Sequence, residues 1–379
     1  MLEKIAKLCT KHGFVFPVES RVNGSLLTCY DFGPMGAAFS SNILKEWWDS
    51  VVLNKPSIYP VINTAQTSCP DSVPIGMDKE NPLFLPPSLA KGTLLWYPYV
   101  FSEMNHRLPL GIVQCGKCFT RENIDQSKFI YQSSVFTQLL LQYFVSPKDT
   151  NKWFGYWVQE RLNWWRTFSK YPPNFITADE EENEDLHQQQ ICIKFAFPWG
   201  LDNVETITVK RVETIGELDT LSQVTTGKKS VVPQLIESST ILEQAMLAYL
   251  VDSYEEGVKN SDTKEMKKVI HLHPRLAPYK VAVATVHSQD HSTSEMREVA
   301  DYVGLLLSES GIMALHLKES TLDSIYTKMD ESGIPYCVII DEKTFINGVV
   351  SLRSRDTSLK DQLHLSDVNW CLVKILETY

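Results

Sequence analysis

The chain has 379 residues, of which 43% are hydrophobic, and a formal net charge of −10. This length and apolar share allow two or three globular domains, whereas the acidic balance excludes a uniformly basic coat for nucleic acid, because phosphate binding requires concentrated Lys and Arg. No apolar run is long enough to cross a bilayer, so we expect no association with a membrane.

The first hundred residues contain two predicted helices and a proline-rich connection. Leu2, Ile5 and Leu8 recur at helical spacing, but this segment lacks the arginines of a good mitochondrial targeting signal. A second helix is predicted over 37–52, after the turn DFGPMG. The stretch 68–91 carries five prolines, which forbid long helices and indicate an irregular connection.

The middle of the chain reads as two strands followed by a helix. Residues 110–119 and 135–145 are apolar and flank the polar TRENIDQSK, so both are predicted strands. Aromatic residues recur three or four apart over 151–170, which predicts a helix whose aromatic stripe lies in the core. The acidic run at 179–185 is typical of a solvated loop.

The sequence after Pro274 alternates short apolar strands with helices. Strands are predicted over 281–286, 313–317, 336–340 and 349–353, and helices over 292–308, 320–329 and 366–377. The pair Asn347-Gly348 predicts a hairpin turn before the last strand. This alternation predicts a compact α/β domain of roughly 100 residues.

Two cysteines three residues apart, in the stretch QCGKC, raise the question of a metal or redox site. Cys115 and Cys118 lie within a predicted strand and have no second Cys pair or suitably spaced Cys/His pair to complete a zinc site. Nor do they lie at a helix N-terminus, where redox pairs are found. We therefore expect structural cysteines, no metal and no cofactor.

Several motifs then resemble the class II glycyl-tRNA synthetases, in the same order along the chain. They are GFVFP (13–17), YDFGPMGAAFSSNILKEWW (30–48), GIVQCGKCFTRE (111–122), LIESSTILEQAM (235–246) and HPRLAPYKVAV (273–283). The resemblance implies an α+β class II synthetase-like core, with an antiparallel sheet and helices, followed by an α/β domain like the anticodon-binding domain of synthetases.

The residues that such synthetases use for adenylation are replaced. Their second motif has Phe-Arg-x-Glu, and Thr120 stands at the arginine position; Arg121 is adjacent, but a one-residue slip on a strand points a side chain to the opposite face. Their third motif has Gly-x-Gly-Arg, and here Ile241, Glu243 and Gln244 stand at the two glycines and the arginine. Neither Thr nor Gln supplies a charge for phosphate, and two such losses would cost on the order of 10⁴-fold in rate. We expect no adenylation activity.

One family combines this architecture with lost adenylation residues, the accessory subunits of the mitochondrial DNA polymerase gamma. The chain resembles it through HRLPLG (106–111), RLNWWRTFSKYPPNF (161–175), FPWG (197–200), MLAYLVDSY (246–254), KVIHLHPRLAPYKVAV (268–283) and NGVVSLRSRDTSLKDQLHLS (347–366). The resemblance implies a processivity factor that has no chemistry of its own. It implies binding to the catalytic subunit, chiefly through the C-terminal domain, and to double-stranded primer-template DNA. It also implies location in the mitochondrial matrix or nucleoid.

The same resemblance sets the expected domains and oligomeric state. We expect a core at 1–272 and an anticodon-binding-like domain at 273–379. Vertebrate-type members carry a helical dimerisation insert where this chain has the short, proline-rich connection 68–105. We therefore expect no stable homodimer and one-to-one pairing with the polymerase.

Two sets of residues are candidates for the interfaces. Gly348, Arg353, Arg355 and Asp356 belong to the string after Asn347 and are candidates for binding the polymerase; the alternative is that the arginines pair with Asp356 or hold the fold together. Lys264, Lys267, Lys268 and Arg275 belong to the one basic concentration of an acidic chain and are candidates for binding DNA. Their alternative role is a solvated linker at the domain boundary.

Two rival functions remain at this point. One is a divergent but active glycyl-tRNA synthetase, and the other is a synthetase-derived module that binds RNA. Glycine-dependent exchange of pyrophosphate into ATP tests the first, and relative affinity for tRNA and primer-template duplex tests the second.

Overall fold

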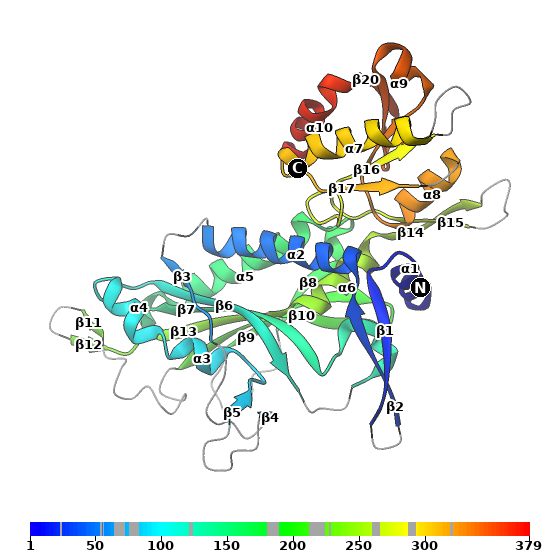
Figure 1. Cartoon of the computed structure of the whole chain (residues 1–379). Coiled ribbons are helices and arrows are strands. Elements are labelled where there is room, and N and C mark those ends of the chain that lie inside the picture. The colour runs from blue at the N-terminus through cyan, green and yellow to red at the C-terminus, as the bar shows by residue number, and fades with distance from the viewer. Residues whose placement is uncertain are drawn as a thin grey trace. The chain divides into compact units, whose positions relative to one another are not determined.

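The computed structural model describes the chain in two compact units (Figure 1). Unit 1 comprises Met1–Asn42, Phe168–Tyr171 and Tyr249–Tyr379, and unit 2 comprises Ile43–Thr167 and Pro172–Ala248. The described residues are 1–22, 25–53, 55, 57–63, 73–75, 83–120, 124–179, 189–211, 224–226, 229–259, 266–286, 293–318 and 321–379.

Unit 2 is built on a seven-stranded sheet with the strand order β3-β6-β7-β13-β10-β9-β8. Neighbouring strands are antiparallel, except that β3 runs parallel to β6. The strands are β3 (Ile58–Pro60), β6 (Leu110–Phe119), β7 (Val135–Val145), β8 (Phe175–Asp179), β9 (Gln190–Phe197), β10 (Gly200–Arg211) and β13 (Gln234–Ile241). The predicted strands 110–119 and 135–145 are confirmed and pair with each other.

One long helix, α5 (Thr150–Thr167), packs against this sheet and confirms the aromatic stripe as core. Its Trp157 ring lies 5.2 Å from that of Tyr143 on β7. Its Arg161 donates to the carboxylate of Glu205 on β10 at 2.8 Å, and Trp165 donates to the same carboxylate at 2.6 Å. Arg161 and Glu205 are both buried away from water, and their opposite charges neutralise each other.

The described part of the connection 68–105 contains only short elements. They are the strands β4 (Val73–Ile75) and β5 (Leu83–Leu85) and the helices α3 (Ala90–Leu94) and α4 (Tyr97–Glu103). Elsewhere in unit 2, β11 (Val224–Thr226) pairs with β12 (Lys229–Val231).

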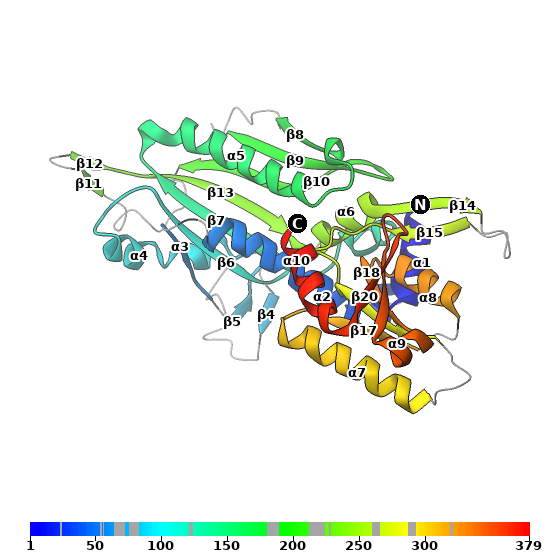
Figure 2. The same cartoon turned by 90° about the horizontal axis from the view of Figure 1, so that it is seen from above.

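The N-terminal part of unit 1 is a helix followed by a two-stranded ribbon. Helix α1 (Leu2–Lys11) buries Ile5 and Leu8, as their spacing predicts, and also Cys9, whereas Leu2 is half-buried. Strands β1 (Val15–Val22) and β2 (Ser25–Phe32) pair antiparallel and lead into α2 (Pro34–Trp48). In both views α1 lies beside α8 (Leu322–Glu331) and β14 (Tyr254–Lys259) (Figures 1 and 2).

The C-terminal part of unit 1 is a three-layer α/β domain. Helix α6 (Leu242–Ser253) leads into the hairpin of β14 and β15 (Met266–Ile270). A five-stranded sheet follows in the order β17-β16-β18-β19-β20. Its strands are β16 (Val281–Thr285), β17 (Ala314–Leu317), β18 (Tyr336–Ile340), β19 (Val349–Ser354) and β20 (Lys360–His364). The strands predicted after Pro274 are thus confirmed, and β20 is an additional edge strand.

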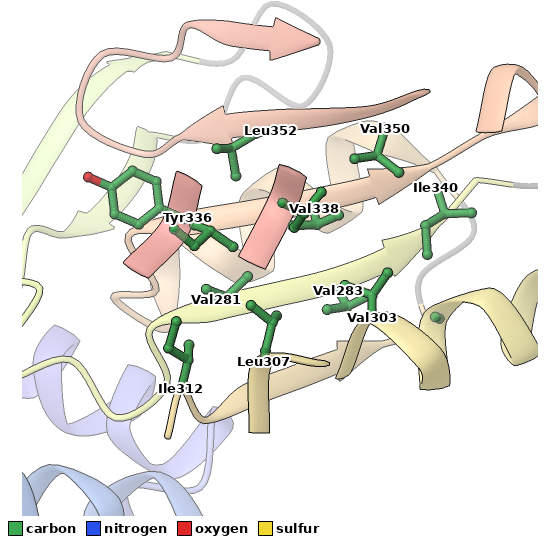
Figure 3. Packing of buried hydrophobic residues seen from close by; sticks show 13 residues of the cluster. Val281, Val283, Val303, Leu307, Ile312, Tyr336, Val338, Ile340, Val350 and Leu352 are labelled. Atoms are coloured by element: carbon green, nitrogen blue, oxygen red, sulfur yellow. The ribbon is translucent and has the colours of Figure 1, made fainter. Parts of the chain in front are cut away.

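The two faces of this sheet are covered by different helices because successive side chains along each strand point to opposite faces. Val281 and Val283 pack with residues of α7 (Thr293–Glu309) and α10 (Val368–Glu377) (Figure 3). Ala282 and Ala284 pack with residues of α8. The predicted helices are confirmed; Ser292 and Ser320 lie outside the described residues, and Thr321 caps α8.

The predicted hairpin turn at Asn347-Gly348 is wrong. Residues Glu342–Asn347 form helix α9, which Asp341 caps at its start. Gly348 ends that helix in the left-handed conformation, with φ of 73°. The Asn-Gly pair indicates a positive φ, which a hairpin turn and a helix C-terminus both require, so the dipeptide alone does not distinguish them.

Candidate functional site

The second-motif position lies just after β6. The Thr120 N–H donates to the carbonyl of Ser134 at 2.9 Å, which continues the pairing of β6 with β7 by one residue. Arg121 and Glu122 lie outside the described residues. Thr120 carries no positive charge for a nucleotide phosphate.

The third-motif positions lie where β13 gives way to α6. Ile241 is the last residue of β13, and Glu243 is buried in the first turn of α6 with an exposed fraction of 4%. The Glu243 carboxylate accepts from the N–H and the hydroxyl of Thr137 at 2.8 and 2.9 Å, and Lys117 Nζ lies 3.2 Å away. Gln244 donates to the carbonyl of Tyr131 at 3.4 Å. The substituted residues therefore connect α6 to neighbouring segments.

The face of this sheet opposite α5 carries a polar layer that the chain itself covers. Gln114, Gln138 and Gln142 lie on that face, as the period of two along β6 and β7 requires. Gln138 accepts from the Leu89 N–H at 2.7 Å, and Gln142 donates to the Ala90 carbonyl at 3.2 Å. Gln114 accepts from a hydroxyl of α3 at 2.9 Å.

Leu89 packs on this face of the sheet. Its side chain is 3% exposed and packs against Cys118 of β6 and Leu140 of β7. A methyl group added at Gly116 would lie 3.4 Å from Leu89 Cδ2, in ordinary van der Waals contact, so Leu89 lies directly over this part of β6. The segment 88–93 thus forms a lid on the sheet face that adjoins the degenerate motif positions.

Burial keeps the two cysteines of QCGKC protonated. It raises the pKa of Cys115 to about 11 and that of Cys118 to about 12. Thiolates are the form that attacks disulfides and binds zinc, so these thiols are unreactive near neutral pH. Within the ranges that the structure describes, no group of three or more His, Cys, Asp and Glu residues is arranged to hold a metal ion.

Arg353 is buried on the α8 side of the C-terminal sheet. Its guanidinium lies 3.2 Å from the carboxylate of Asp330 and 4.3 Å from the ring centroid of Tyr326. Asp330 is 1% exposed and also contacts Lys267 at 2.7 Å. The Arg353 side chain is committed to contacts within unit 1.

Arg355 is also buried and lies at the end of β19. Its guanidinium donates to the carbonyls of Ile270, Gly333 and Leu272 at 3.1, 2.8 and 2.9 Å. It also binds Asp356 at 2.8 Å. Burial raises the pKa of Asp356, but the hydrogen bonds with His271 and Arg355 outweigh burial and hold that pKa well below its usual range. Both arginines thus stabilise the fold around β19.

The DNA-binding candidates lie in different surroundings. Lys267 and Lys268 are adjacent on β15 and point to opposite faces of the hairpin: Lys267 toward Asp330, and Lys268 opposite Glu256 of β14. Arg275 lies over the ring of Phe168 at 5.4 Å. Lys264 lies outside the described residues.

Sequence reasoning missed a group of exposed apolar side chains on the C-terminal domain. Tyr302 and Leu305 on α7 are 51% and 58% exposed, and Trp370 on α10 is 68% exposed. All three lie on the polar sides of their helices, so the helical periodicity marks them as outliers. Single exposed apolar residues are common on protein surfaces, so a role for these three in binding is part of the proposal below.

The chain resembles two groups of known proteins. A family model described as "Anticodon binding domain" matches residues 280–374. DNA polymerase subunit gamma-2 of Bos taurus is 31% identical over 430 residues, which cover 99% of this chain and 86% of the relative. DNA polymerase subunit gamma-2, mitochondrial, of Xenopus laevis is 29% identical over 97% of this chain and 86% of the relative. Glycine--tRNA ligase of Borreliella burgdorferi is 26% identical over 97% of this chain and 96% of the relative.

These similarities confirm the fold expected from the motifs, a class II synthetase-like core followed by an anticodon-binding domain. The similarities to the gamma-2 subunits extend over 97% and 99% of this chain and so include both the core and the C-terminal domain. Among the described residues, no helix combines the length and the apolar character needed to span a membrane. With 31% identity to the Bos taurus protein over 99% of this chain, the chain belongs to the family of DNA polymerase subunit gamma-2.

Proposed function

We propose that this chain is a non-catalytic accessory subunit of the mitochondrial DNA polymerase. It binds the catalytic subunit mainly through its C-terminal domain and strengthens the binding of the holoenzyme to primer-template DNA. Family membership supports the role. The observation that carries the absence of catalysis is the buried carboxylate of Glu243, which stands where a synthetase of the glycyl class has a glycine.

The site is unsuited to a nucleoside triphosphate for electrostatic and steric reasons. Lys117 partly neutralises the Glu243 carboxylate, but Thr120 and Gln244 provide no charge that would bind the phosphates. Leu89 and its neighbours occupy the adjoining sheet face. The Glu243 carboxylate also has a structural role, because it accepts two hydrogen bonds from Thr137.

The proposed polymerase-binding surface consists of Tyr302, Leu305 and Trp370. They lie on α7 and α10, which cover the same face of the C-terminal sheet. The exposed charges around these residues are mixed: Glu298, Asp301, Glu309 and Arg297 on α7, and Lys374 one turn from Trp370 on α10. An apolar centre with a mixed, mainly acidic surround fits an amphipathic segment of the catalytic subunit that carries basic residues.

Gly348, Arg353, Arg355 and Asp356 have an indirect part in this proposal. The two guanidinium groups are buried and bonded within unit 1, so their contribution is to hold β19 and the strands beside it. Gly348 ends α9, and Asp356 binds Arg355 and His271. Substitution of any of them is expected to weaken polymerase binding through the shape of the domain.

We also propose that the protein acts in mitochondria and pairs with the polymerase one to one. The printed name of the Xenopus laevis relative includes "mitochondrial". The two described helices of the connection 68–105 are only 5 and 7 residues long, too short for a helical dimerisation bundle. A concentration-independent dimer mass in light scattering would contradict this stoichiometry.

Primer extension by the mitochondrial catalytic subunit tests the main proposal. Adding this chain at raised salt should lengthen the products, because a second DNA-binding subunit slows dissociation from the template. Products of unchanged length at saturating concentrations would overturn the proposal.

A variant with Tyr302→Ser, Leu305→Ser and Trp370→Ser should lose most of the stimulation while remaining folded. The matched control removes exposed apolar residues of unit 2, Ile62→Ser and Leu201→Ser, which are 80% and 57% exposed. Equal loss in both variants would contradict the assigned surface.

The chain is similar to a glycine--tRNA ligase over 97% of its length, so the enzymatic alternative is tested with the reaction of that ligase. Glycine-dependent pyrophosphate exchange should stay at background for this chain, and turnover at the rate of an active ligase would replace the proposal. Binding of tRNA much tighter than binding of primer-template duplex would instead favour an RNA-binding module.

A further inference from the structure

The exposed side of α1 carries a row of lysines. Lys4, Lys7 and Lys11 have side-chain exposed fractions of 54%, 75% and 59%. Their spacing of three and four residues places them on one face of the helix. The opposite face of α1 is buried in unit 1.

This row adjoins a lysine of the β14–β15 hairpin. Lys4 Nζ lies 2.7 Å from the carboxylate of Glu256 on β14. Glu256 is the cross-strand partner of Lys268 on β15, so Lys268 points to the same side of the hairpin. At the other end of α1, Lys11 lies 2.5 Å from Glu331 of α8. The structure thus joins two lysine groups that are more than 250 residues apart in the sequence.

Each lysine of α1 has a carboxylate partner. The partner of Lys7 is Glu3, at 2.8 Å and 83% exposed, and that of Lys4 is Glu256, which is 26% exposed. Ion pairs of exposed lysines stabilise a protein little and are weakened by salt, so exchange of these two carboxylates for phosphate costs little. Glu331 is only 9% exposed and also contacts the His12 ring at 2.8 Å, so it holds Lys11 more firmly.

We propose that Lys4, Lys7, Lys11 and Lys268 form one surface that binds the phosphate backbone of duplex DNA. This inference rests on the proposed function and locates its DNA contact. The distance along α1 from Lys4 to Lys11 is about 10 Å. Measured along the DNA axis, this is about three base-pair steps of about 3.4 Å. Lys267 is not part of this surface, because it points to Asp330.

A membrane surface is the other polyanion that a lysine-bearing helix binds. Such helices insert their apolar face into the bilayer, and Ile5, Leu8 and Cys9 of α1 are buried in the protein instead. The buried apolar face therefore favours a nucleic acid as the partner.

The test measures the affinity of the full chain for a labelled 30-base-pair duplex by fluorescence anisotropy over a range of salt concentrations. The variant replaces Lys4, Lys7 and Lys11 with Gln. Loss of two or three phosphate contacts should lower the slope of log K against log salt by about 2 to 3. Near 0.1 M salt, one decade below the 1 M reference, the affinity should fall about 100- to 1,000-fold.

The matched control replaces three exposed helical lysines elsewhere, with the changes Lys45→Gln, Lys152→Gln and Lys374→Gln. It removes the same charge and should leave the slope unchanged. Equal slopes for wild type and the α1 variant, or equal losses in the α1 variant and control, would overturn the inference. Thermal unfolding of all three proteins verifies that they are folded.

Two further measurements separate this inference from the proposed function. The α1 variant should still bind the catalytic subunit in a pull-down assay. A wild-type chain that stimulates the polymerase without binding duplex would overturn the DNA surface alone. Lysine-dependent sedimentation with phosphatidylcholine vesicles containing phosphatidylserine, in the absence of duplex binding, would overturn it in favour of a membrane.

Discussion

Glu243 accepts two hydrogen bonds from Thr137, one from its backbone N–H at 2.8 Å and one from its hydroxyl at 2.9 Å. The pair joins the first turn of α6 to β7, and the carboxylate lies at the positive end of the helix dipole. A position that in a glycyl-type synthetase leaves room for nucleotide thus holds a structural contact here. The substitution that we propose removes adenylation chemistry thus also supplies a structural contact.

Replacing Glu243 with Gln should destabilise the protein by about 1–3 kcal/mol, because an amide NH₂ would face a donor of Thr137 in a buried place. Urea unfolding measures the change, and Glu103→Gln on an exposed position serves as control. The variant should show no glycine-dependent pyrophosphate exchange. Unchanged stability would contradict the structural role of the carboxylate.

Truncating Leu89 to Ala should cost about 3 kcal/mol, because the side chain is 3% exposed and leaves a cavity against Cys118 and Leu140. Leu53→Ala, at a position that is 70% exposed, should change stability by less than about 0.5 kcal/mol. Differential scanning calorimetry of the two variants provides the comparison. Equal effects would show that the lid segment is not packed on the sheet.

Replacing Arg353 with Met should destabilise the C-terminal domain by about 3 kcal/mol, because it leaves the buried Asp330 carboxylate without its guanidinium partner. Lys267 still contacts Asp330 and limits the loss. The double variant Arg353→Met with Asp330→Leu should recover more than half of it, since no buried charge then remains. Failure of the second substitution to help would indicate that packing, and not charge, dominates.

Replacing Gly348 with Ala should destabilise the domain by about 1–2 kcal/mol, because φ is 73° and the new Cβ would lie 2.5 Å from His364 Nε2. Gly155→Ala offers an instructive control. It lies within α5 with no atom within 4 Å of the added carbon, so it should stabilise by about 0.5–1 kcal/mol. Opposite signs for the two glycines are the expected result in chemical unfolding.

The lowered pKa of His273 makes the stability of the protein depend on pH. Burial, aided by Arg275 and Lys280, lowers the pKa of His273 to about 4, and its ring lies between Phe168 and Tyr379. Because the unfolded chain binds this proton near pH 6.5, stability should fall as the pH drops from about 6.5 to 4 and should not change above that window.

The expected loss is about 1–3 kcal/mol, since solvent screens part of the effect at a partly exposed ring. Chemical unfolding at pH 7 and pH 4.5 measures it, and His273→Phe should remove this contribution while other groups keep theirs. An unchanged pH dependence in the variant would contradict the assignment.

The local patterns of the sequence determined most elements of the C-terminal domain. Helices cover both faces of its sheet, so the central strands are buried on both sides and appear in the sequence as continuous apolar runs. The aromatic stripe of α5 was equally clear. The turn at Asn347-Gly348 was predicted wrongly, since a positive φ suits both a hairpin and a helix end.

The candidate site depended on information that the sequence alone contained only in part. Motif order identified Thr120, Ile241, Glu243 and Gln244, because substitutions are visible at known spacing. Which atoms Glu243 and Leu89 contact was decided by the sheet, whose pairing joins β6, β7 and β13 across more than a hundred residues. Arg353 and Arg355 appeared as charged residues on a strand, and only their burial beside Asp330 and three backbone carbonyls defines their role.

The sequence by itself determined the family-type architecture and the loss of charge at the motif positions, since both follow from residue identity and order. The tertiary structure decided which lysines share a surface. Lys267 and Lys268 are neighbours in sequence but point apart on a strand, whereas Lys4 and Lys268 are distant in sequence and share Glu256 as a neighbour. Electrostatic interaction depends on distance in space, which only the folded chain sets.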